Sequence, residues 1–245
     1  MKNHINTIIV CVSVIICVCI FSVELVALKT AQNNYITVTG SATKSFTADL
    51  IVWRGAFSQK GKTTKEAYDM LRKDTLAVKD YLVKNGVAES EIVFSSILTD
   101  ENVQHEYSES GRLIKTTLTG YTLTQEVTIN SRDVDRIERV SRDITELIDR
   151  GVGFFSMSPE YYYTKLDELK LDLIAASAEN TRLRAQTIAG EAGGEISRLR
   201  SASLGVFQIT AENSSAEEYS SGGVFNVSSK NKTAFITTRL EYLLK

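Results

Sequence analysis

Reactive side chains are scarce in this chain after residue 31. The cysteines (Cys11, Cys17 and Cys19) all lie in one apolar N-terminal segment, and His105 is the only histidine beyond His4. A Ser-His-Asp relay would need His105 as its general base, but the sequence contains no G-x-S-x-G elbow. We therefore expect His105 to be an exposed histidine in a polar loop, not a catalytic base.

The acidic segment around His105 has ligand types for a cation but not a complete pattern. Asp100, Glu101, His105 and Glu106 could supply oxygens and one nitrogen. Calcium is bound by several oxygens on a tight loop that usually contains glycine, and zinc prefers three or four nitrogen or sulfur ligands. The sequence therefore predicts a solvated acidic segment and no metal site.

Paired carboxylates and paired glycines also lack the spacing that chemistry requires. Asp167-Glu168 and Glu217-Glu218 are adjacent in sequence, so their side chains point in different directions and do not form a glycosidase pair. Gly193-Gly194 follows a predicted helix, whereas a phosphate-binding loop precedes one. We predict no cofactor and no enzymatic activity. The remaining enzyme alternative is a hydrolase of unfamiliar type that uses His105.

Aromatic and basic residues are the better candidates for function, as parts of a binding surface. Three consecutive tyrosines could form an interface or could be ordinary core and edge aromatics of a strand. Two arginines near residue 183 could contact a partner, although nearby glutamates also favour local salt bridges. The candidate interface residues are Trp53, Tyr161, Tyr162, Tyr163, Arg182 and Arg184.

The first 30 residues form a hydrophobic leader, interpreted as a signal anchor or transmembrane segment. Ile8–Val23 carries no charge and is slightly longer than the apolar stretch of a cleaved signal peptide, and no clean A-x-A site comes after it. Ile5–Leu28 has about the 20 residues that a spanning helix needs. We favour an uncleaved membrane anchor, with a removed signal peptide as the alternative.

Composition and leader together indicate an exported domain. A short N-terminal leader usually directs the export of the domain behind it, and a domain without cysteine suits an oxidising compartment. We expect the large domain to lie in the periplasm or otherwise outside the cytoplasm, as part of the cell envelope. The formal net charge is −2, so the chain has no basic surplus for nucleic acid. Residues 31–245 are predicted to form a single domain.

Hydrophobic periodicity predicts an α+β fold. Thr63 and Glu66 form a capping box that opens a helix ending at Asn85-Gly86. Further helices are predicted at Asp133–Arg150, capped by Ser131, and at Lys165–Ala192, opened by Thr164. Alternation of apolar and polar residues predicts strands at Tyr35–Thr43, Phe46–Ser58, Glu91–Leu98, Leu113–Asn130, Phe154–Tyr163, Glu195–Ala211 and Lys232–Leu244.

The predicted order is β-β-α-β-β-α-β-α-β-β after an N-terminal hydrophobic helix. Well-separated amphipathic helices between strands favour mainly antiparallel sheets backed by three helices. Thr99–Arg112 is predicted to be a loop or an irregular strand extension. In the longest helix, Leu183 and Thr187 are placed on the apolar face, and small residues such as Ala185 allow close packing.

Four segments, in order, resemble the SIMPL-domain family of bacterial envelope proteins, which includes periplasmic and outer-membrane immunogenic members. Ile36–Ala42 resembles the family's opening strand with its V-x-G-x-A/G turn, and Gly120–Val127 is similar to its G-Y-x-x-x-Q-x-V strand. Asp133–Gly151 resembles a helix that ends in glycine, and Ala175–Gly194 resembles the alanine- and arginine-rich helix before a glycine pair. The resemblance covers about Tyr35–Leu244.

The chain departs from the family where prolines often occur. It has Ser45-Phe46 after the first strand and Ser220–Gly223 before the last one. The resemblance implies an α+β fold, homo-oligomers that are ring-like or channel-like in some members, no catalytic motif, and a role in envelope integrity or stress tolerance.

We therefore expect a non-enzymatic, membrane-tethered or exported envelope protein that self-assembles into homo-oligomers. The alternative is a monomeric periplasmic module that binds a small molecule or an envelope partner protein, with the ligand between sheet and long helix beside Trp53 or the tyrosine run.

Overall fold

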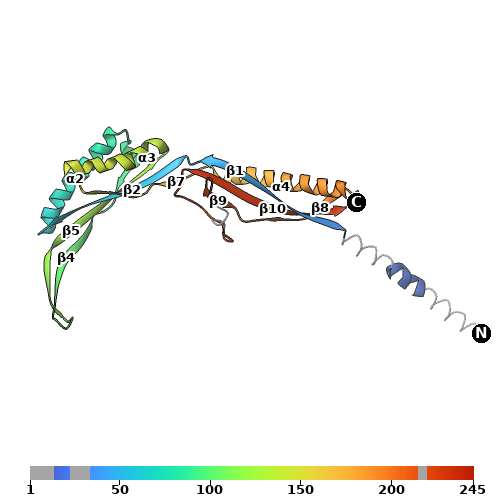
Figure 1. Ribbon diagram of the computed structural model, residues 1–245, viewed down its shortest axis with the longest axis horizontal. Helices are drawn as coiled ribbons and strands as arrows, with labels where there is room; N and C mark the ends of the chain where they lie inside the picture. Colours follow the sequence, from blue (N-terminus) through green and yellow to red (C-terminus); the bar gives the residue numbers. More distant parts are fainter. Residues whose placement is uncertain (1–13, 23–33, 215–219) are drawn as a thin grey trace, which may run out of the picture.

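The computed structural model describes residues 14–22, 34–214 and 220–245. Within these ranges the strands form two antiparallel sheets, one beyond the other along the long axis of the molecule (Figure 1). Residues 50–162 form one unit, which we call the inserted lobe. Residues 35–47, 166–214 and 220–244 form the other, which we call the terminal lobe. The chain thus leaves the terminal lobe after its first strand and returns to it at the last long helix.

The terminal lobe is built on the pairing of the first and last strands. β1 (Tyr35–Thr47) runs antiparallel to β10 (Asn231–Leu244), from the pair Tyr35↔Leu243 to the pair Thr47↔Asn231. β8 (Ile196–Leu204) and β9 (Gln208–Ala211) both pair with β10. The start of β1 and the C-terminus therefore lie at the same end of the molecule (Figure 1).

The inserted lobe is built on two long central strands, β2 (Leu50–Gly61) and β5 (Leu113–Ser131). The strands β3 (Ile92–Phe94) and β4 (Leu98–Tyr107) pair with β5. The short strands β6 (Phe154–Ser156) and β7 (Glu160–Tyr162) pair with β2. Pro159 lies between the two short strands and interrupts the pairing with β2, because proline has no N–H to donate to the ladder.

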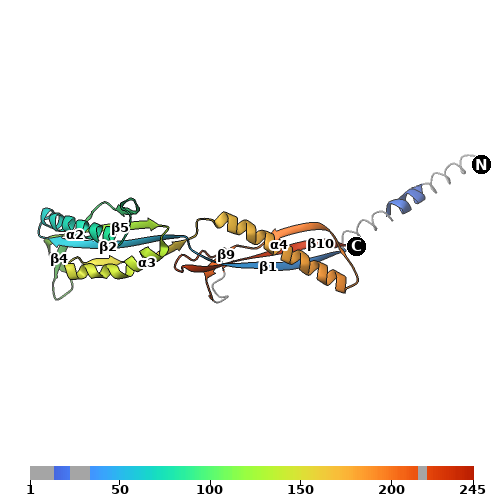
Figure 2. The same cartoon turned by 90° about the horizontal axis from the view of Figure 1, so that it is seen from above.

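Helices cover one face of each sheet. α2 (Thr64–Lys84) and α3 (Val134–Asp143) lie side by side over the sheet of the inserted lobe (Figure 2), and α3 continues as a 3-10 helix, η2 (Ile144–Arg150). A shorter 3-10 turn, η1 (Glu89–Glu91), precedes β3. α4 (Leu166–Glu191) covers the terminal lobe. The inserted lobe has one large hydrophobic core, with Ile51, Trp53, Leu71, Ile129 and Ile137 at its centre. The terminal lobe has two smaller hydrophobic clusters.

The predicted α+β class is confirmed, and the predicted order of elements is roughly matched. The structure has one strand more than predicted in each of the three strand runs that follow α2, α3 and α4. The residues predicted as a loop or strand extension, Thr99–Arg112, begin as strand β4, so the second alternative is the correct one. Residues 14–22 form an exposed helix, and the rest of the proposed anchor Ile5–Leu28 lies outside the described residues. No helix in the described ranges combines the length and hydrophobicity needed to cross a bilayer.

Two of the predicted helix caps are wrong. Asp133, not Ser131, caps α3, because its carboxylate accepts a hydrogen bond from the Arg136 N–H at 3.1 Å. Thr164 does not cap α4, because its N–H and hydroxyl both donate to Asp49. At α2 the Thr63 hydroxyl accepts from the Glu66 N–H as predicted, but the Glu66 carboxylate accepts from the Lys62 N–H, one residue earlier than expected.

α4 approaches β1 closely along a row of small and hydroxyl side chains. Its buried residues recur every fourth position, at Leu169, Leu173, Ser177, Thr181, Ala185 and Ala189. The buried Ser177 hydroxyl donates to Thr238 at 2.7 Å, so burying it costs little. A Cβ atom on Gly40 would lie 2.4 Å from the Thr181 hydroxyl oxygen, so only glycine fits there. Leu183 and Thr187, predicted on the buried face, are exposed because the contact follows the four-residue row instead.

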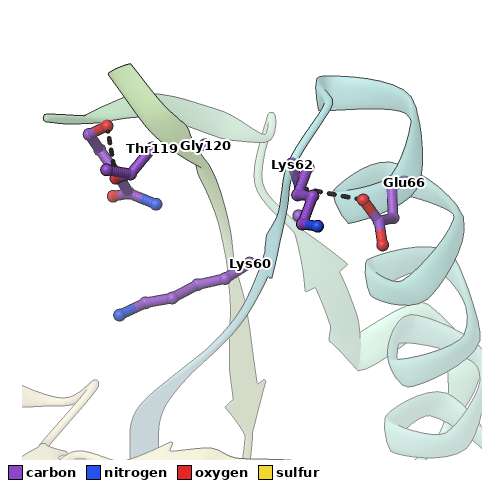
Figure 3. A pocket seen from close by; sticks show the side chains of 7 residues that line it. Lys60, Lys62, Glu66, Thr119 and Gly120 are labelled. Atoms are coloured by element: carbon purple, nitrogen blue, oxygen red, sulfur yellow. Dashed lines mark hydrogen bonds between the residues drawn. The ribbon is translucent and has the colours of Figure 1, made fainter. Parts of the chain in front are cut away.

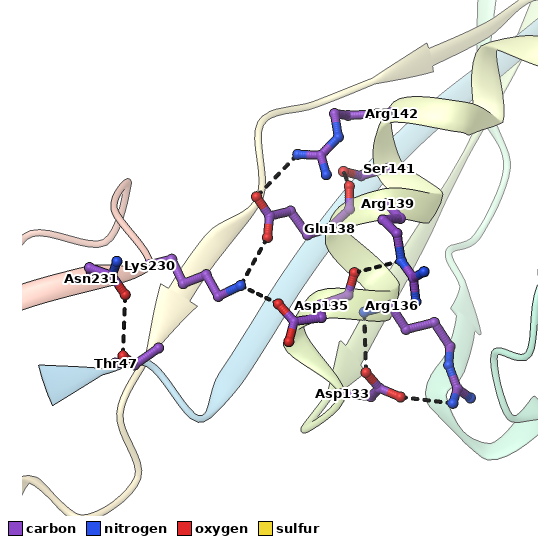
Figure 4. A network of polar contacts seen from close by, with 10 residues as sticks. All are labelled: Thr47, Asp133, Asp135, Arg136, Glu138, Arg139, Ser141, Arg142, Lys230 and Asn231. Carbon is purple, nitrogen blue, oxygen red and sulfur yellow. Dashed lines mark hydrogen bonds and ion pairs between the residues drawn. The ribbon is translucent and has the colours of Figure 1, made fainter.

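Polar contacts join the lobes where the chain passes between them (Figure 4). Lys230, just before β10, forms ion pairs with Asp135 and with Glu138 of α3, the latter at 3.2 Å. The Tyr161 N–H donates to the Val227 carbonyl at 2.7 Å. The hydrogen bond to Lys230 lowers the pKa of Asp135. Residues of the terminal lobe are therefore tied to the inserted lobe by charge as well as by the backbone.

Candidate assembly surfaces

The structure places His105 on strand β4, not in a loop, and exposes it as expected. Its Nδ1 lies 2.9 Å from the Thr116 hydroxyl on β5, and its ring centroid lies 6.2 Å from that of Tyr107. The carboxylates Asp100, Glu101 and Glu106 are spread along the same strand. Among the described residues no three His, Cys, Asp or Glu side chains converge on a site for a metal ion.

Trp53 and Tyr161, two of the predicted interface residues, are enclosed in the inserted lobe. Trp53 is 0% exposed, and its indole N–H donates to the Met157 carbonyl and to the Ser156 hydroxyl, at 3.1 Å each. Tyr161 is buried, and burial raises the pKa of its phenol. An enclosed side chain presents no area to a partner, so both residues support the core of this chain.

Tyr162 and Tyr163 are half-buried at the junction of the lobes. The Tyr162 hydroxyl donates to Glu160 at 2.9 Å, which raises the pKa of the phenol. The Tyr163 ring packs against Phe46, with centroids 4.8 Å apart. Alternation along β7 turns Tyr162 away from the face that buries Tyr161, and Tyr163 lies just after the end of β7. The tyrosine run therefore splits into a core residue and two junction residues.

Arg182 and Arg184 lie on α4 but have different surroundings. Arg182 is held by two hydrogen bonds to Glu179, at 2.7 and 2.9 Å, which is the local salt bridge that the sequence offered as an alternative. Arg184 reaches β1, where it donates to the Thr39 carbonyl at 3.4 Å. No carboxylate in the described part of the chain pairs with Arg184.

A groove of about 380 Å³ runs between β1 and α4 beside Arg184. Its walls are mainly apolar, and Leu183 and Ile188 are half-exposed there, at 50% and 52%. The sequence signal for this groove was the apolar stripe that contains Leu183, which was assigned to the buried face. The groove is lined by Val38, Thr39, Asn180, Leu183, Arg184, Thr187 and Ile188.

β4 and the first half of β5 form a two-stranded ribbon that leaves the body of the inserted lobe (Figure 1). Beyond the irregularity between Asn102 and Val103, where the pairing skips Thr119, we call residues 103–118 the arm. The Thr119 hydroxyl donates to the Asn102 carbonyl at 2.9 Å. A Cβ on Gly120 (φ +153°) would lie 2.5 Å from the Gly61 carbonyl, so glycine allows the bend.

The arm is amphipathic, and its apolar face is open. The cross-strand pairs Val103↔Leu118 and Tyr107↔Leu113 lie on one face with His105↔Thr116 between them, and Gln104 and Glu106 point the other way. The exposed fractions of Val103, Tyr107, Leu113 and Leu118 are 43%, 61%, 50% and 48%. An isolated two-stranded ribbon is marginally stable in water, so this face is suited to a partner surface.

A second hollow, of about 490 Å³, lies at the base of the arm and is polar (Figure 3). Lys60 near the end of β2 and Lys62 just after it border the hollow together with Asn102 and Thr119. Glu66 and Thr63 already occupy the N-terminus of α2, so the backbone donors there are partly satisfied. The described residues that line this hollow include no histidine and no cysteine.

Three solved structures that this chain matches are distant from it. A de novo designed protein, Foldit4, has 9% identity and a TM-score of 0.22, covering 44% of this chain and 93% of that one. The GlnK–ATP complex of B. subtilis has 13% identity and a TM-score of 0.23, covering 44% of this chain and 85% of that one. A hydantoinase/carbamoylase-family amidase from Burkholderia phymatum has 11% identity and a TM-score of 0.27, covering 63% of this chain and 38% of that one. Such low scores support no argument about fold or function.

No curated protein matches the chain. The family model SIMPL, described as a protein of unknown function (DUF541), matches residues 36–235, from the first strand of the terminal lobe into the first part of its last strand. Because that match takes in both lobes, this chain belongs to the SIMPL family.

Proposed function

We propose that this chain is a non-enzymatic, membrane-tethered protein of the cell envelope that assembles into homo-oligomers and contributes to envelope integrity or stress tolerance. The observation that carries the proposal is the open apolar face of the arm. A soluble monomer gains nothing by holding Tyr107, Leu113 and Leu118 in water, whereas a contact with another copy would bury them.

The architecture suits a tether at one end. β1 begins beside the C-terminal end of β10, so a leader preceding β1 enters the terminal lobe at the end remote from the inserted lobe. An anchor in one bilayer raises the effective concentration of the copies it holds, which favours weak contacts between them. The leader Ile5–Leu28 supplies enough apolar residues for such an anchor.

A monomeric binding module remains the second candidate, and the groove between β1 and α4 is the observation in its favour. This groove lies between sheet and long helix, where the alternative places a ligand, although Trp53 and Tyr161 do not line it. A small apolar ligand would fill the groove in a monomer, whereas self-assembly would fill it with protein.

The test is the mass of the full chain in mild detergent, measured by light scattering over a range of concentrations, with N-terminal sequencing of the mature protein. We expect a mass of several copies that falls on dilution, and an N-terminus that retains the leader. A single copy at tens of micromolar would overturn self-assembly and leave the binding module. A mature N-terminus near residue 31 would overturn the tether alone.

A further inference from the structure

We propose that the free edge of β4 in one copy pairs with the free edge of β1 in the next copy, with the apolar side chains of β4 lying in the groove beside α4. This inference rests on the proposed self-assembly and identifies the two surfaces that meet. The contact is head-to-tail, because β4 belongs to the inserted lobe and β1 to the terminal lobe.

β1 is a long edge strand. One edge pairs with β10 over all of Tyr35–Thr47, and no described strand pairs with the other edge. Edge strands offer unpaired N–H and C=O groups to another chain unless something covers them. Here the cover consists of two long bonds from α4, in which Asn180 accepts from the Ser41 N–H at 3.3 Å and Arg184 donates to the Thr39 carbonyl at 3.4 Å.

The edge of β1 can form main-chain hydrogen bonds with an added strand, and the groove beside it can bind the side chains of that strand. An extended segment that adds to a sheet edge gains affinity from main-chain hydrogen bonds and specificity from pockets for alternate side chains. Leu183 and Ile188 offer apolar surface on the α4 side, and Arg184 adds a positive charge that no described carboxylate neutralises. The site therefore fits an extended segment that carries both apolar and acidic side chains.

β4 is a segment of that kind. It spans Leu98–Tyr107 and pairs on one edge with β5, while no strand in the described ranges pairs with its other edge. Alternate positions place Glu101, Val103 and Tyr107 on one face of the strand. The strand contains three carboxylates and no lysine or arginine, and none of these carboxylates forms an ion pair within the described residues. They are Asp100, Glu101 and Glu106.

Charge selects the β4–β1 pairing over the symmetric alternatives. Two β1 edges meeting would bring Arg184 of one copy toward Arg184 of the other, and two β4 edges would bring carboxylates together. A β4 edge on a β1 edge instead brings Glu101 and its neighbours toward Arg184. Complementary charge mainly fixes the choice of partner and the register, while the apolar contacts supply affinity.

The consequence is a contact that uses different surfaces on its two sides. Such a contact leaves one unused β4 edge and one unused β1 edge on every dimer, so it propagates until the rotation closes a ring or continues as a filament. A symmetric contact would stop at the dimer.

The experiment uses full-length variants in the same mild detergent. Leu183→Glu places a negative charge in the groove, and Val103→Glu places one on the apolar face of β4. Both positions are exposed, and circular dichroism checks that each variant folds. Leu171→Glu on α4 and Val93→Glu on β3 are matched controls, because these side chains are also exposed, at 69% and 56%, but lie outside the groove and β4.

We expect each test variant alone to self-associate about tenfold more weakly than the wild type or worse, because a buried unpaired charge is costly. An equimolar mixture of the two variants should form dimers and nothing larger, since β4 of the Leu183→Glu copy is intact and so is the groove of the Val103→Glu copy. The controls should assemble as the wild type does.

Two outcomes would overturn the pairing while leaving self-assembly in place. The first is a Leu183→Glu variant that assembles as the wild type does. The second is a mixture that stays monomeric although both folded variants fail alone. A wild-type chain that is itself a single copy would overturn both the proposed function and this contact.

Discussion

Asp49 and Thr164 are joined by two hydrogen bonds of 2.7 Å, one from the Thr164 N–H and one from its hydroxyl. Asp49 lies between β1 and β2, where the chain enters the inserted lobe, and Thr164 lies between β7 and α4, where it returns. The Asp49 N–H also donates to the Tyr162 carbonyl at 3.0 Å. The outgoing and returning segments are thereby fixed to each other, which limits how far the lobes can turn.

Asp49→Ala is expected to destabilise the protein and to loosen the arrangement of its lobes. Loss of two hydrogen bonds to a carboxylate at a half-buried site should lower the free energy of unfolding by about 1–2 kcal/mol. Urea unfolding measures the stability, and small-angle scattering measures the spread of molecular dimensions. Asp172→Ala is the control, since the ion pair of Asp172 with Lys44 is exposed and should contribute less than about 1 kcal/mol. Equal effects of the two substitutions would contradict a special role for Asp49.

Lys230→Met is expected to remove part of the acid sensitivity of the protein. The hydrogen bond from Lys230 lowers the pKa of Asp135 in the folded state. A lowered pKa contributes stability above the unfolded value, near about 4, and this contribution is lost as the pH falls through the folded value. The wild type should therefore melt at a higher temperature than the variant at pH 7, and the gap should narrow in acid.

Arg142→Met is the matched control for this comparison, because Arg142 pairs with Glu138 within α3 and does not cross between the lobes. It should leave the scattering profile unchanged, while Lys230→Met should broaden it. If the difference in stability between wild type and Lys230→Met stayed constant from pH 7 to pH 3, the ion pairs of Lys230 with α3 would not contribute to the pH dependence of stability.

Lys232→Met is expected to stabilise the protein at neutral pH. Lys232 is 1% exposed, and its ammonium group donates to the Asn226 carbonyl at 2.5 Å and lies 3.4 Å from the Asn226 side-chain oxygen. Burial lowers its pKa from 10.5 to about 8. Replacing a buried charge that has no opposite charge beside it with a side chain of similar length should raise the free energy of unfolding by about 1–2 kcal/mol.

The difference in stability between wild type and Lys232→Met should shrink as the pH rises. Below the folded value of about 8 the native and unfolded states both carry the proton, so the penalty of Lys232 is fully present. Between that value and 10.5 the unfolded state binds more protons, so the wild type gains stability as the pH rises and the gap to the variant closes. Chemical denaturation at pH 7 and at pH 10 measures both gaps, and a gap that widens at pH 10 would refute the assignment.

Gly40→Ala is expected to push α4 away from β1. Its Cβ would lie 2.4 Å from the Thr181 hydroxyl oxygen and 2.7 Å from the Thr181 backbone nitrogen. The backbone of α4 must shift, at a cost of about 1–3 kcal/mol. Gly190→Ala in α4 is the opposite case, because a Cβ there meets nothing within 4 Å and alanine favours the helix by about 0.5–1 kcal/mol. The melting temperature should fall for Gly40→Ala and rise for Gly190→Ala, as measured by thermal denaturation.

The order of elements could be predicted because the local signals agree with the tertiary structure. Alternation in Leu113–Asn130 marks β5, and glycines at positive φ stop two helices, Gly86 at +84° and Gly151 at +83°. These signals depend on neighbours in sequence. The division into lobes depends instead on which strands pair, and alternation alone does not determine partners.

The candidate surfaces were harder to predict because exposure is a property of the whole fold. The single tryptophan was assigned to an interface, yet Trp53 lies on the buried face of β2 where its indole N–H finds two acceptors. Leu183 was placed in the core, yet α4 contacts β1 along a different row of side chains. The sequence left the acidic segment around His105 open between a loop and an irregular strand extension, and pairing with β5 makes it a strand.

The pairing of β1 with β10 also bears on how the chain comes to its final shape during synthesis. β1 is among the earliest residues of the folded region to emerge, but its partner strand is complete only when residue 244 has been made. Residues 50–162 are continuous and contain their own core, so they can fold while the ribosome is still at work. Until Asn231–Leu244 has been made, neither edge of β1 has its partner strand, and this is the interval in which a holding chaperone would matter most.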